Sequence, residues 1–115
     1  MARLLDIPGD SVLVNRDRAI LELLYSSGLR LSELTDLNVG DVDVADATVR
    51  LTGKGNKDRI VPVGRKALAA LARWQKCRGE LAPAEESALF VSQRGTRLSK
   101  RSVQARVTHW AKRQG

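Results

Sequence analysis

The 115-residue sequence contains few of the residues on which several classes of protein depend. Its single cysteine, Cys77, excludes a disulfide framework and a paired-cysteine metal site, and favours a reducing compartment. Aromatic residues make up only 3% of the chain, so the core is expected to consist of leucine, valine, isoleucine and alanine. The same scarcity argues against an RNA-binding protein, because RNA-binding modules stack bases on aromatic rings.

Long hydrophobic runs are also missing. No apolar stretch reaches the length of a membrane-spanning helix, and the N-terminus has no signal-peptide pattern. The sequence therefore predicts a soluble, cytoplasmic protein with no membrane partner. No pattern in it predicts a metal, a cofactor or a small-molecule substrate.

Positive charge is abundant and unevenly placed, with a formal net charge of +7. Residues 1–52 carry 5 basic and 9 acidic side chains, whereas residues 53–78 carry 8 basic and 1 acidic. Residues 79–86 carry 3 acidic and no basic side chains, and residues 87–115 carry 7 basic and no acidic ones. Two separate basic blocks are the footprint expected for a polyanion such as double-stranded DNA. A solubilising surface would explain them equally well.

The hydrophobic periodicity predicts an α+β fold that is mostly helical, with a small antiparallel three-stranded sheet. Helices are expected over residues 15–27, 32–37 and 65–78, and after Ser99 to about Arg113. Asn15, Ser32 and Ser99 are the expected N-cap residues, and Gly28 and Gly79 are expected to end the first and third of these helices. Strands are expected at residues 42–44, 48–51 and 59–63, with a further short strand or buried segment at 89–91.

The turn between the second and third strands is the most informative stretch. Residues 52–59 read Thr-Gly-Lys-Gly-Asn-Lys-Asp-Arg, which predicts a β-hairpin with a cationic tip. A lysine flanked by glycines, such as Lys54, reaches a phosphate without obstruction from a bulky neighbour. Placed against DNA among Lys57 and Arg59, it is suited to donate a proton. The alternative is an ordinary solvated turn.

Arg30 is the second residue with a pattern suited to phosphate. It follows Gly28 by two residues and lies between Leu29 and Leu31, so packing of its stem would present a fixed guanidinium fork. Glu33 is placed to steady it, although a plain surface ion pair between the two is the alternative. Phosphoryl transfer on DNA needs cations on the phosphate oxygens and an acid for the leaving 5′ oxygen.

Four strings in this sequence resemble the catalytic domain of the tyrosine recombinase, or phage integrase, family. They are LYSSGLRLSEL at residues 24–34, GKGNKDRIVPVG at 53–64, ALFVS at 88–92 and LSKRSVQ at 98–104. Their order and spacing are similar to the bacterial XerC/XerD type, and the last helix is more similar to the XerC branch. The resemblance covers nearly the whole chain, from about residue 3 to the end.

The resemblance implies a fold and a set of roles. Residues 15–115 would be the front part of the catalytic domain, and residues 1–14 a remnant of the link to a preceding domain. Arg30 would be the first catalytic arginine, on the scissile phosphate, and Lys54 the hairpin lysine that protonates the leaving hydroxyl. The implied DNA contacts are Lys57 and Arg59 in the hairpin, and Lys100, Arg101, Gln104 and Arg106 in a final helix along the major groove.

The implied reaction cuts and rejoins DNA through a 3′-phosphotyrosine, together with a partner recombinase, in chromosome dimer resolution at cell division. The family's His-x-x-Arg motif, its second His or Trp and its tyrosine nucleophile are expected beyond Gly115, so this chain alone is expected to be inactive. We expect His109 to be a surface or half-buried helix residue, and Tyr25 a core or half-buried packing residue. A non-catalytic DNA-binding module, using the hairpin and last helix, is the alternative.

Overall fold

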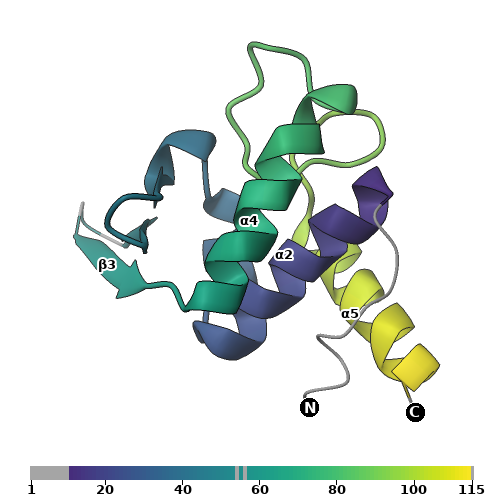
Figure 1. Cartoon of the computed structure of the whole chain (residues 1–115), viewed down its shortest axis with the longest axis horizontal. Helices are drawn as coiled ribbons and strands as arrows, with labels where there is room; N and C mark the ends of the chain where they lie inside the picture. The colour runs from purple at the N-terminus through teal and green to yellow at the C-terminus, as the bar shows by residue number, and fades with distance from the viewer. Residues whose placement is uncertain (1–10, 54, 56, 115) are drawn as a thin grey trace.

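The computed structural model describes residues 11–53, 55 and 57–114. Its helices are α2 (Val12–Ser26), α3 (Leu31–Asp36), α4 (Arg65–Cys77) and α5 (Lys100–Gln114), with short 3-10 helices η1 (Val39–Asp41) and η3 (Arg78–Glu80). The strands β1 (Val42–Asp43), β2 (Thr48–Thr52) and β3 (Asp58–Pro62) form one antiparallel sheet in the order β1-β2-β3. Strand β3 lies to one side of helices α2, α4 and α5 (Figure 1). The predicted fold class is confirmed.

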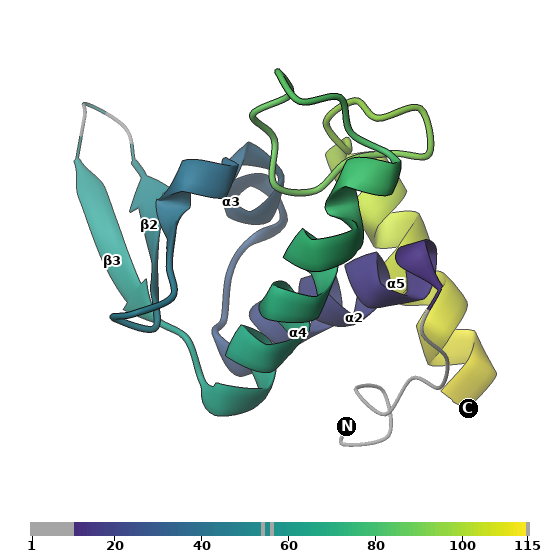
Figure 2. The ribbon, with the colours of Figure 1, turned by 45° about the horizontal axis from the view of Figure 1, so that its top comes forward.

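Helix α2 is the centre of the molecule. Ala19, Ile20, Leu21 and Leu23 are all at most 1% exposed, because both sides of the helix are covered. Helix α4 packs across one side of α2 and α5 lies on the other, while the sheet projects from the side of the helical layer (Figure 2). An apolar pattern around the whole helix predicted this burial, and the structure confirms it.

Two helices begin at residues other than those predicted. Helix α2 begins at Val12, where the hydroxyl of Ser11 accepts a hydrogen bond from the Val14 amide at 3.2 Å; the Asn15 cap was wrong. Helix α3 begins at Leu31, with Arg30 rather than Ser32 as its N-cap residue. The carboxylate of Glu33 accepts a hydrogen bond from the Arg30 amide at 2.9 Å. The start of α3 is therefore capped by a side chain from inside its own first turn.

The sheet agrees with the predicted strands to within one residue at each end. Of the two alternatives predicted for residues 89–91, a short strand or a buried segment, the buried segment is confirmed; the pairing nearby, among the residues that the structure describes, is two isolated bridges, Asn38 with Ala88 and Val91 with Arg97. Gly79 does not end helix α4 as predicted: α4 ends at Cys77, and the chain continues into the 3-10 helix η3 from Arg78. The apolar sequence at residues 89–91 therefore reflects burial in the core rather than membership of a sheet.

The core contains more aromatic surface than the composition predicted. Trp74 and Phe90 are 0% and 1% exposed, and their rings stack with centroids 6.3 Å apart. The indole nitrogen of Trp74 donates to the carbonyl oxygen of Leu89 at 2.8 Å. The expectation of a purely aliphatic core was wrong, because two of the four aromatic residues lie at its centre, surrounded by leucine, valine, isoleucine and alanine side chains.

Gly95 is required by its backbone conformation, and its replacement gives a first test of the structure. Its φ is +81°, and an added Cβ would collide with the carbonyl oxygen of Leu81 and lie 3.1 Å from Cδ of Pro83. Gly95→Ala is therefore expected to lower the free energy of unfolding by about 2 kcal/mol or more, measured by denaturant titration. Gly40→Ala is the matched control, because nothing lies within 4 Å of the position that its added methyl group would occupy. Equal stability of the two variants would contradict the loop conformation.

Candidate nucleic-acid interface

Arg30 and the hairpin meet at one corner of the molecule through Glu33. One oxygen of the Glu33 carboxylate accepts the backbone amide of Arg30 at 2.9 Å, and the other pairs with the Arg59 guanidinium at 3.2 Å. The Glu33 side chain is 18% exposed and that of Arg59 is 60% exposed. The Arg30 side chain itself is exposed to solvent. Glu33 therefore joins the start of α3, where Arg30 lies, to the strand that leads away from the hairpin tip.

The register of the hairpin explains why Arg59 reaches Glu33. Arg59 lies opposite Leu51, and residues paired across antiparallel strands share one face of the sheet. Leu51 is 3% exposed on the face toward the helices, so Arg59 is directed to the same face. The amide of Gly53 donates to the carbonyl of Lys57 at 2.7 Å and closes the turn. Lys54 lies outside the described residues, so its geometry relative to Arg30 stays a prediction.

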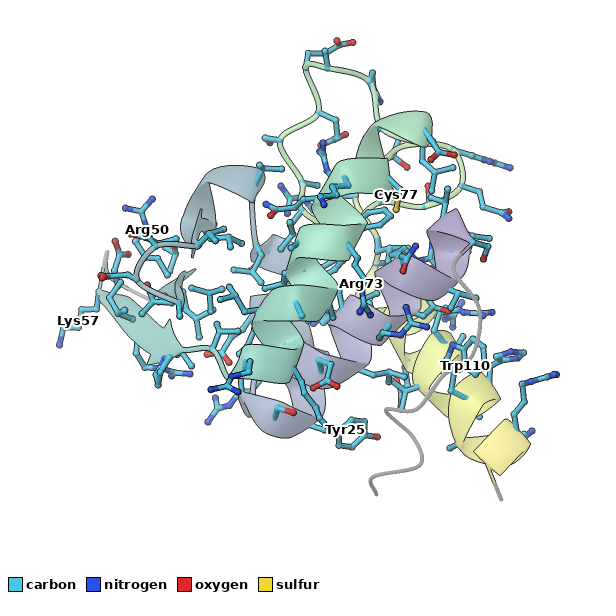
Figure 3. The ribbon with its side chains drawn as sticks, viewed as in Figure 1. Tyr25, Arg50, Lys57, Arg73, Cys77 and Trp110 are labelled. Carbon is cyan, nitrogen blue, oxygen red and sulfur yellow. The ribbon has the colours of Figure 1, made fainter. Side chains whose placement is uncertain are left out.

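Lys57 lies at the outer end of the hairpin. Its side chain is exposed and extends away from the body of the protein (Figure 3). Trp110, near the end of α5, lies at the opposite side in the same view. The hairpin and the C-terminal half of α5 are therefore separate parts of the surface.

The start of α5 presents the predicted DNA-contacting residues. The Ser99 hydroxyl accepts the amide of Ser102 at 3.1 Å, which confirms Ser99 as the cap. Lys100, Arg101 and Gln104 are all exposed. Arg101 and Gln104 are three residues apart, so they lie on one face of the helix.

Arg106 has a different partner from the DNA contact predicted for it. Its Nε donates to Oδ2 of Asp17 at 2.8 Å, and its guanidinium lies over the Trp110 ring, 5.9 Å from the centroid. At 3.6 residues per turn it is about 140° around the helix from Arg101. Arg106 therefore faces α2, while Arg101 faces solvent. The sequence pattern did not reveal this because the partner is 89 residues away.

Other cations of the two basic blocks also have partners within the protein. Arg97 donates to the carbonyl oxygens of Thr35 and Leu37, at 2.7 and 3.0 Å, at the end of α3. Arg78 donates from Nε to the carbonyl of Ala88 at 3.0 Å. Each of these guanidinium groups is thus held by backbone carbonyl oxygens. The counts of basic side chains therefore overstate the charge that is available to a polyanion.

Sequence reasoning missed Asp17, which is 1% exposed and forms ion pairs with both Arg16 and Arg106. Charged residues, including Arg16 and Asp17, within a helix whose apolar residues run nearly all round it were the available signal, because buried charges require partners. Ion pairing across 89 residues was not visible in the pattern.

Three residues bear on covalent chemistry. Tyr25 is 41% exposed, so the predicted core or half-buried position was wrong; it lies one residue before the end of α2, where its ring points outward. His109 is half-buried and meets the Trp110 ring edge-on, as predicted for a helix residue. Burial raises the pKa of the Cys77 thiol, and its Sγ donates to the Arg73 carbonyl at 3.4 Å. Cys77 is therefore protonated at neutral pH and unsuited to be a nucleophile.

The described part of the chain contains neither a membrane span nor a metal cluster. None of its helices has both the length and the hydrophobicity to cross a bilayer. Within those same residues, no three side chains of the types that ligate metals gather closely enough to hold an ion.

Known proteins similar to this chain are tyrosine recombinases. It is 55% identical over 112 residues to the tyrosine recombinase XerC of Shewanella amazonensis, covering 97% of this chain and 38% of that protein. It is 53% and 52% identical to the XerC proteins of Chromohalobacter salexigens and Haemophilus ducreyi, covering 100% of this chain and 38% of each. The chain thus spans about 38% of the length of these relatives.

Solved structures give the same result. The crystal structure of XerA recombinase matches with a TM-score of 0.85 and 26% identity, covering 99% of this chain and 40% of that one. The pre-cleavage complex of XerH recombinase with its difH substrate matches with a TM-score of 0.81 and 25% identity, covering 98% of this chain and 33% of that one. The model of the phage integrase family matches residues 1–115, the full length of the sequence. This chain belongs to the phage integrase family.

Proposed function

We propose that this chain is part of a site-specific tyrosine recombinase that cuts and rejoins double-stranded DNA through a 3′-phosphotyrosine. The corner formed by Arg30, Glu33 and Arg59 carries the proposal. Glu33 contacts both the backbone of Arg30 and the strand that follows the hairpin tip, so the two proposed catalytic groups come from elements joined by one carboxylate. The similarity to XerC proteins over the whole chain supports the same function.

Arg30 acts on the scissile phosphate and Lys54 on the leaving group. Arg30 is exposed at a helix start, where its guanidinium can contact two phosphate oxygens as negative charge develops. The 5′ alkoxide that leaves during cleavage is a poor leaving group unless an acid protonates it, and Lys54 supplies that proton. Neither residue forms the covalent bond to DNA; we assign that role to a tyrosine other than Tyr25.

DNA contacts extend from this corner to the start of α5. Lys57 contacts the backbone beside the hairpin, and Lys100, Arg101 and Gln104 contact the major groove. Arg59 and Arg106 are assigned to positioning rather than to DNA, because their guanidinium groups pair with Glu33 and Asp17. The biological role is chromosome dimer resolution at cell division, in the cytoplasm, with a second recombinase of the same family as partner.

Lys54 is tested in a chimera, in which this chain replaces the matching 112 residues of the Shewanella amazonensis XerC. On a nicked suicide substrate, Lys54→Ala is expected to slow formation of the covalent protein–DNA complex by about 100-fold or more, the range for general acid catalysis. Replacing the 5′ oxygen by sulfur provides a leaving group that needs no proton, and should restore most of the lost rate.

The matched control is Lys57→Ala, which removes a cation from the same hairpin without removing the proposed acid. Its defect should be in DNA affinity and should be equal on both substrates. An equal slowing of the Lys54→Ala chimera on oxygen and sulfur substrates would contradict the acid role. A Tyr25→Phe chimera should form the covalent complex normally, since the nucleophile lies elsewhere.

A further inference from the structure

Asp17 is the most completely hydrogen-bonded carboxylate in the described part of the molecule. Its Oδ1 accepts from Nε and NH2 of Arg16, at 3.0 and 2.9 Å. Its Oδ2 accepts from Nε of Arg106 and from the indole Nε1 of Trp110, both at 2.8 Å. The Asp17 side chain is 1% exposed and that of Arg16 is 6% exposed. We call these four residues the Asp17 cluster.

The cluster joins parts of the chain that are distant in sequence. Asp17 and Arg16 lie on α2, and Arg106 and Trp110 lie on α5. The remaining donor of Arg16, NH1, contacts the carbonyl oxygen of Val91 at 3.2 Å. Apolar packing also holds α5, because Val103 is fully buried in the main core and Trp110 packs against Leu21 of α2. Hydrogen bonds to a carboxylate are directional, so the Asp17 cluster adds a defined rotation of α5 about its own axis to this less directional packing.

That rotation decides where the DNA-facing residues point. Arg106 and Trp110 are four residues apart on the inner face of α5, and Arg101 and Gln104 lie on its exposed face. A helix is rigid over one or two turns, so fixing the inner face fixes the outer face as well. Base-edge hydrogen bonds in the major groove tolerate little misplacement, because the donor and acceptor must meet within about 3 Å.

We propose that Asp17 is a positioning residue for DNA recognition: by holding Arg106 and Trp110, it sets the orientation in which α5 presents Arg101 and Gln104 to DNA. This inference rests on the proposed function, since it requires that α5 contacts DNA. It also gives Arg106 its role, which is to carry the orientation from α2 to α5 rather than to bind a phosphate.

A double-mutant cycle measured by DNA binding tests this role. Binding of the 115-residue chain to a fluorescein-labelled duplex, followed by anisotropy, is compared for the wild type, Asp17→Asn, Arg101→Ala and the double variant. Asp17→Asn is expected to weaken binding by about tenfold, and Arg101→Ala by about tenfold in the wild-type background. Once α5 is misoriented, Arg101 contributes less to DNA affinity, so Arg101→Ala in the Asp17→Asn background should weaken binding by less than about threefold.

Two controls separate positioning from a general loss of stability. Lys57 lies on the hairpin, so Lys57→Ala should weaken DNA binding equally with and without Asp17→Asn. If Asp17→Asn instead partly unfolded the protein, the effects of Lys57→Ala and Arg101→Ala on binding would both change. Glu22→Gln neutralises another buried carboxylate of α2, 3% exposed, whose described partner is the Ser26 hydroxyl of the same helix. In the Glu22→Gln background, Arg101→Ala should therefore still weaken DNA binding about tenfold.

If Asp17→Asn does not fold, Trp110→Phe takes its place, because it removes one donor to Asp17 and keeps most of the ring. If Arg101→Ala still weakens DNA binding about tenfold in a folded Asp17→Asn or Trp110→Phe background, the positioning role is overturned, while the proposed function stays intact. Failure of the wild-type chain to bind the duplex would overturn the proposed DNA contact of α5, and this inference with it.

Discussion

Replacing Trp74 with alanine is expected to lower the free energy of unfolding by about 3–5 kcal/mol, the range for removing a large aromatic side chain from a core. Trp74 is fully buried and stacks on Phe90 with an angle of 17° between the rings. Its indole hydrogen bond to the Leu89 carbonyl joins α4 to the segment around Phe90. Alanine would leave a cavity and remove the donor to a buried carbonyl, and both are costly.

Urea titration followed by circular dichroism measures this loss, and Trp74→Phe separates its two causes. Phenylalanine keeps most of the apolar contact but has no donor for Leu89, so a loss of about 1–2 kcal/mol is expected. Ile60→Ala is the control, because Ile60 is 59% exposed and its truncation should change stability by less than about 0.5 kcal/mol. A Trp74→Ala variant as stable as Ile60→Ala would contradict the described core.

The hairpin and the helices were predictable because their signals are local. The glycine and lysine pattern between two apolar strands predicted β2 and β3 to within one residue at each end, since turn chemistry and strand alternation act over a few residues. Helix starts were harder. Asn15 and Ser32 are good N-cap residues by type, but Ser11 is equally suitable for α2. Helix α3 begins after Arg30, a poor N-cap by type, because the Glu33 carboxylate in its first turn accepts the Arg30 amide.

The amount of available positive charge was harder to predict than the fold, and the errors in it have one physical cause. Arg78, Arg97 and Arg106 were counted as available charge because a sequence gives the type of a side chain and not its direction. Arg97 and Arg106 have partners 60 and 89 residues away. Asp17 escaped notice for the same reason. In this protein, arginine serves both to satisfy interior acceptors and to supply surface charge, and the composition alone does not separate the two uses.

Arg30→Ala is expected to have the largest effect on activity. In the chimera with the Shewanella amazonensis XerC, it should lower the rate of covalent complex formation by about 100- to 1000-fold, as does the removal of a hydrogen-bond donor to charge in other transition states. Arg30→Lys should recover little of this loss, because lysine keeps the charge but cannot donate two parallel hydrogen bonds to one phosphate. The measurement is a single-turnover time course on the suicide substrate.

Arg50→Ala is the matched control for this prediction. Arg50 is also an exposed arginine, but its guanidinium pairs with Asp41 at 3.3 Å, and in the sheet it lies opposite Ile60 rather than in the Leu51–Arg59 pair that reaches Glu33. Its removal should change the rate less than about threefold, because exposed ion pairs contribute little. Equal losses for Arg30→Ala and Arg50→Ala would show a general electrostatic effect. A loss specific to Arg30 that sulfur at the 5′ position does not rescue would assign it to the phosphate oxygens, separately from the leaving-group role of Lys54.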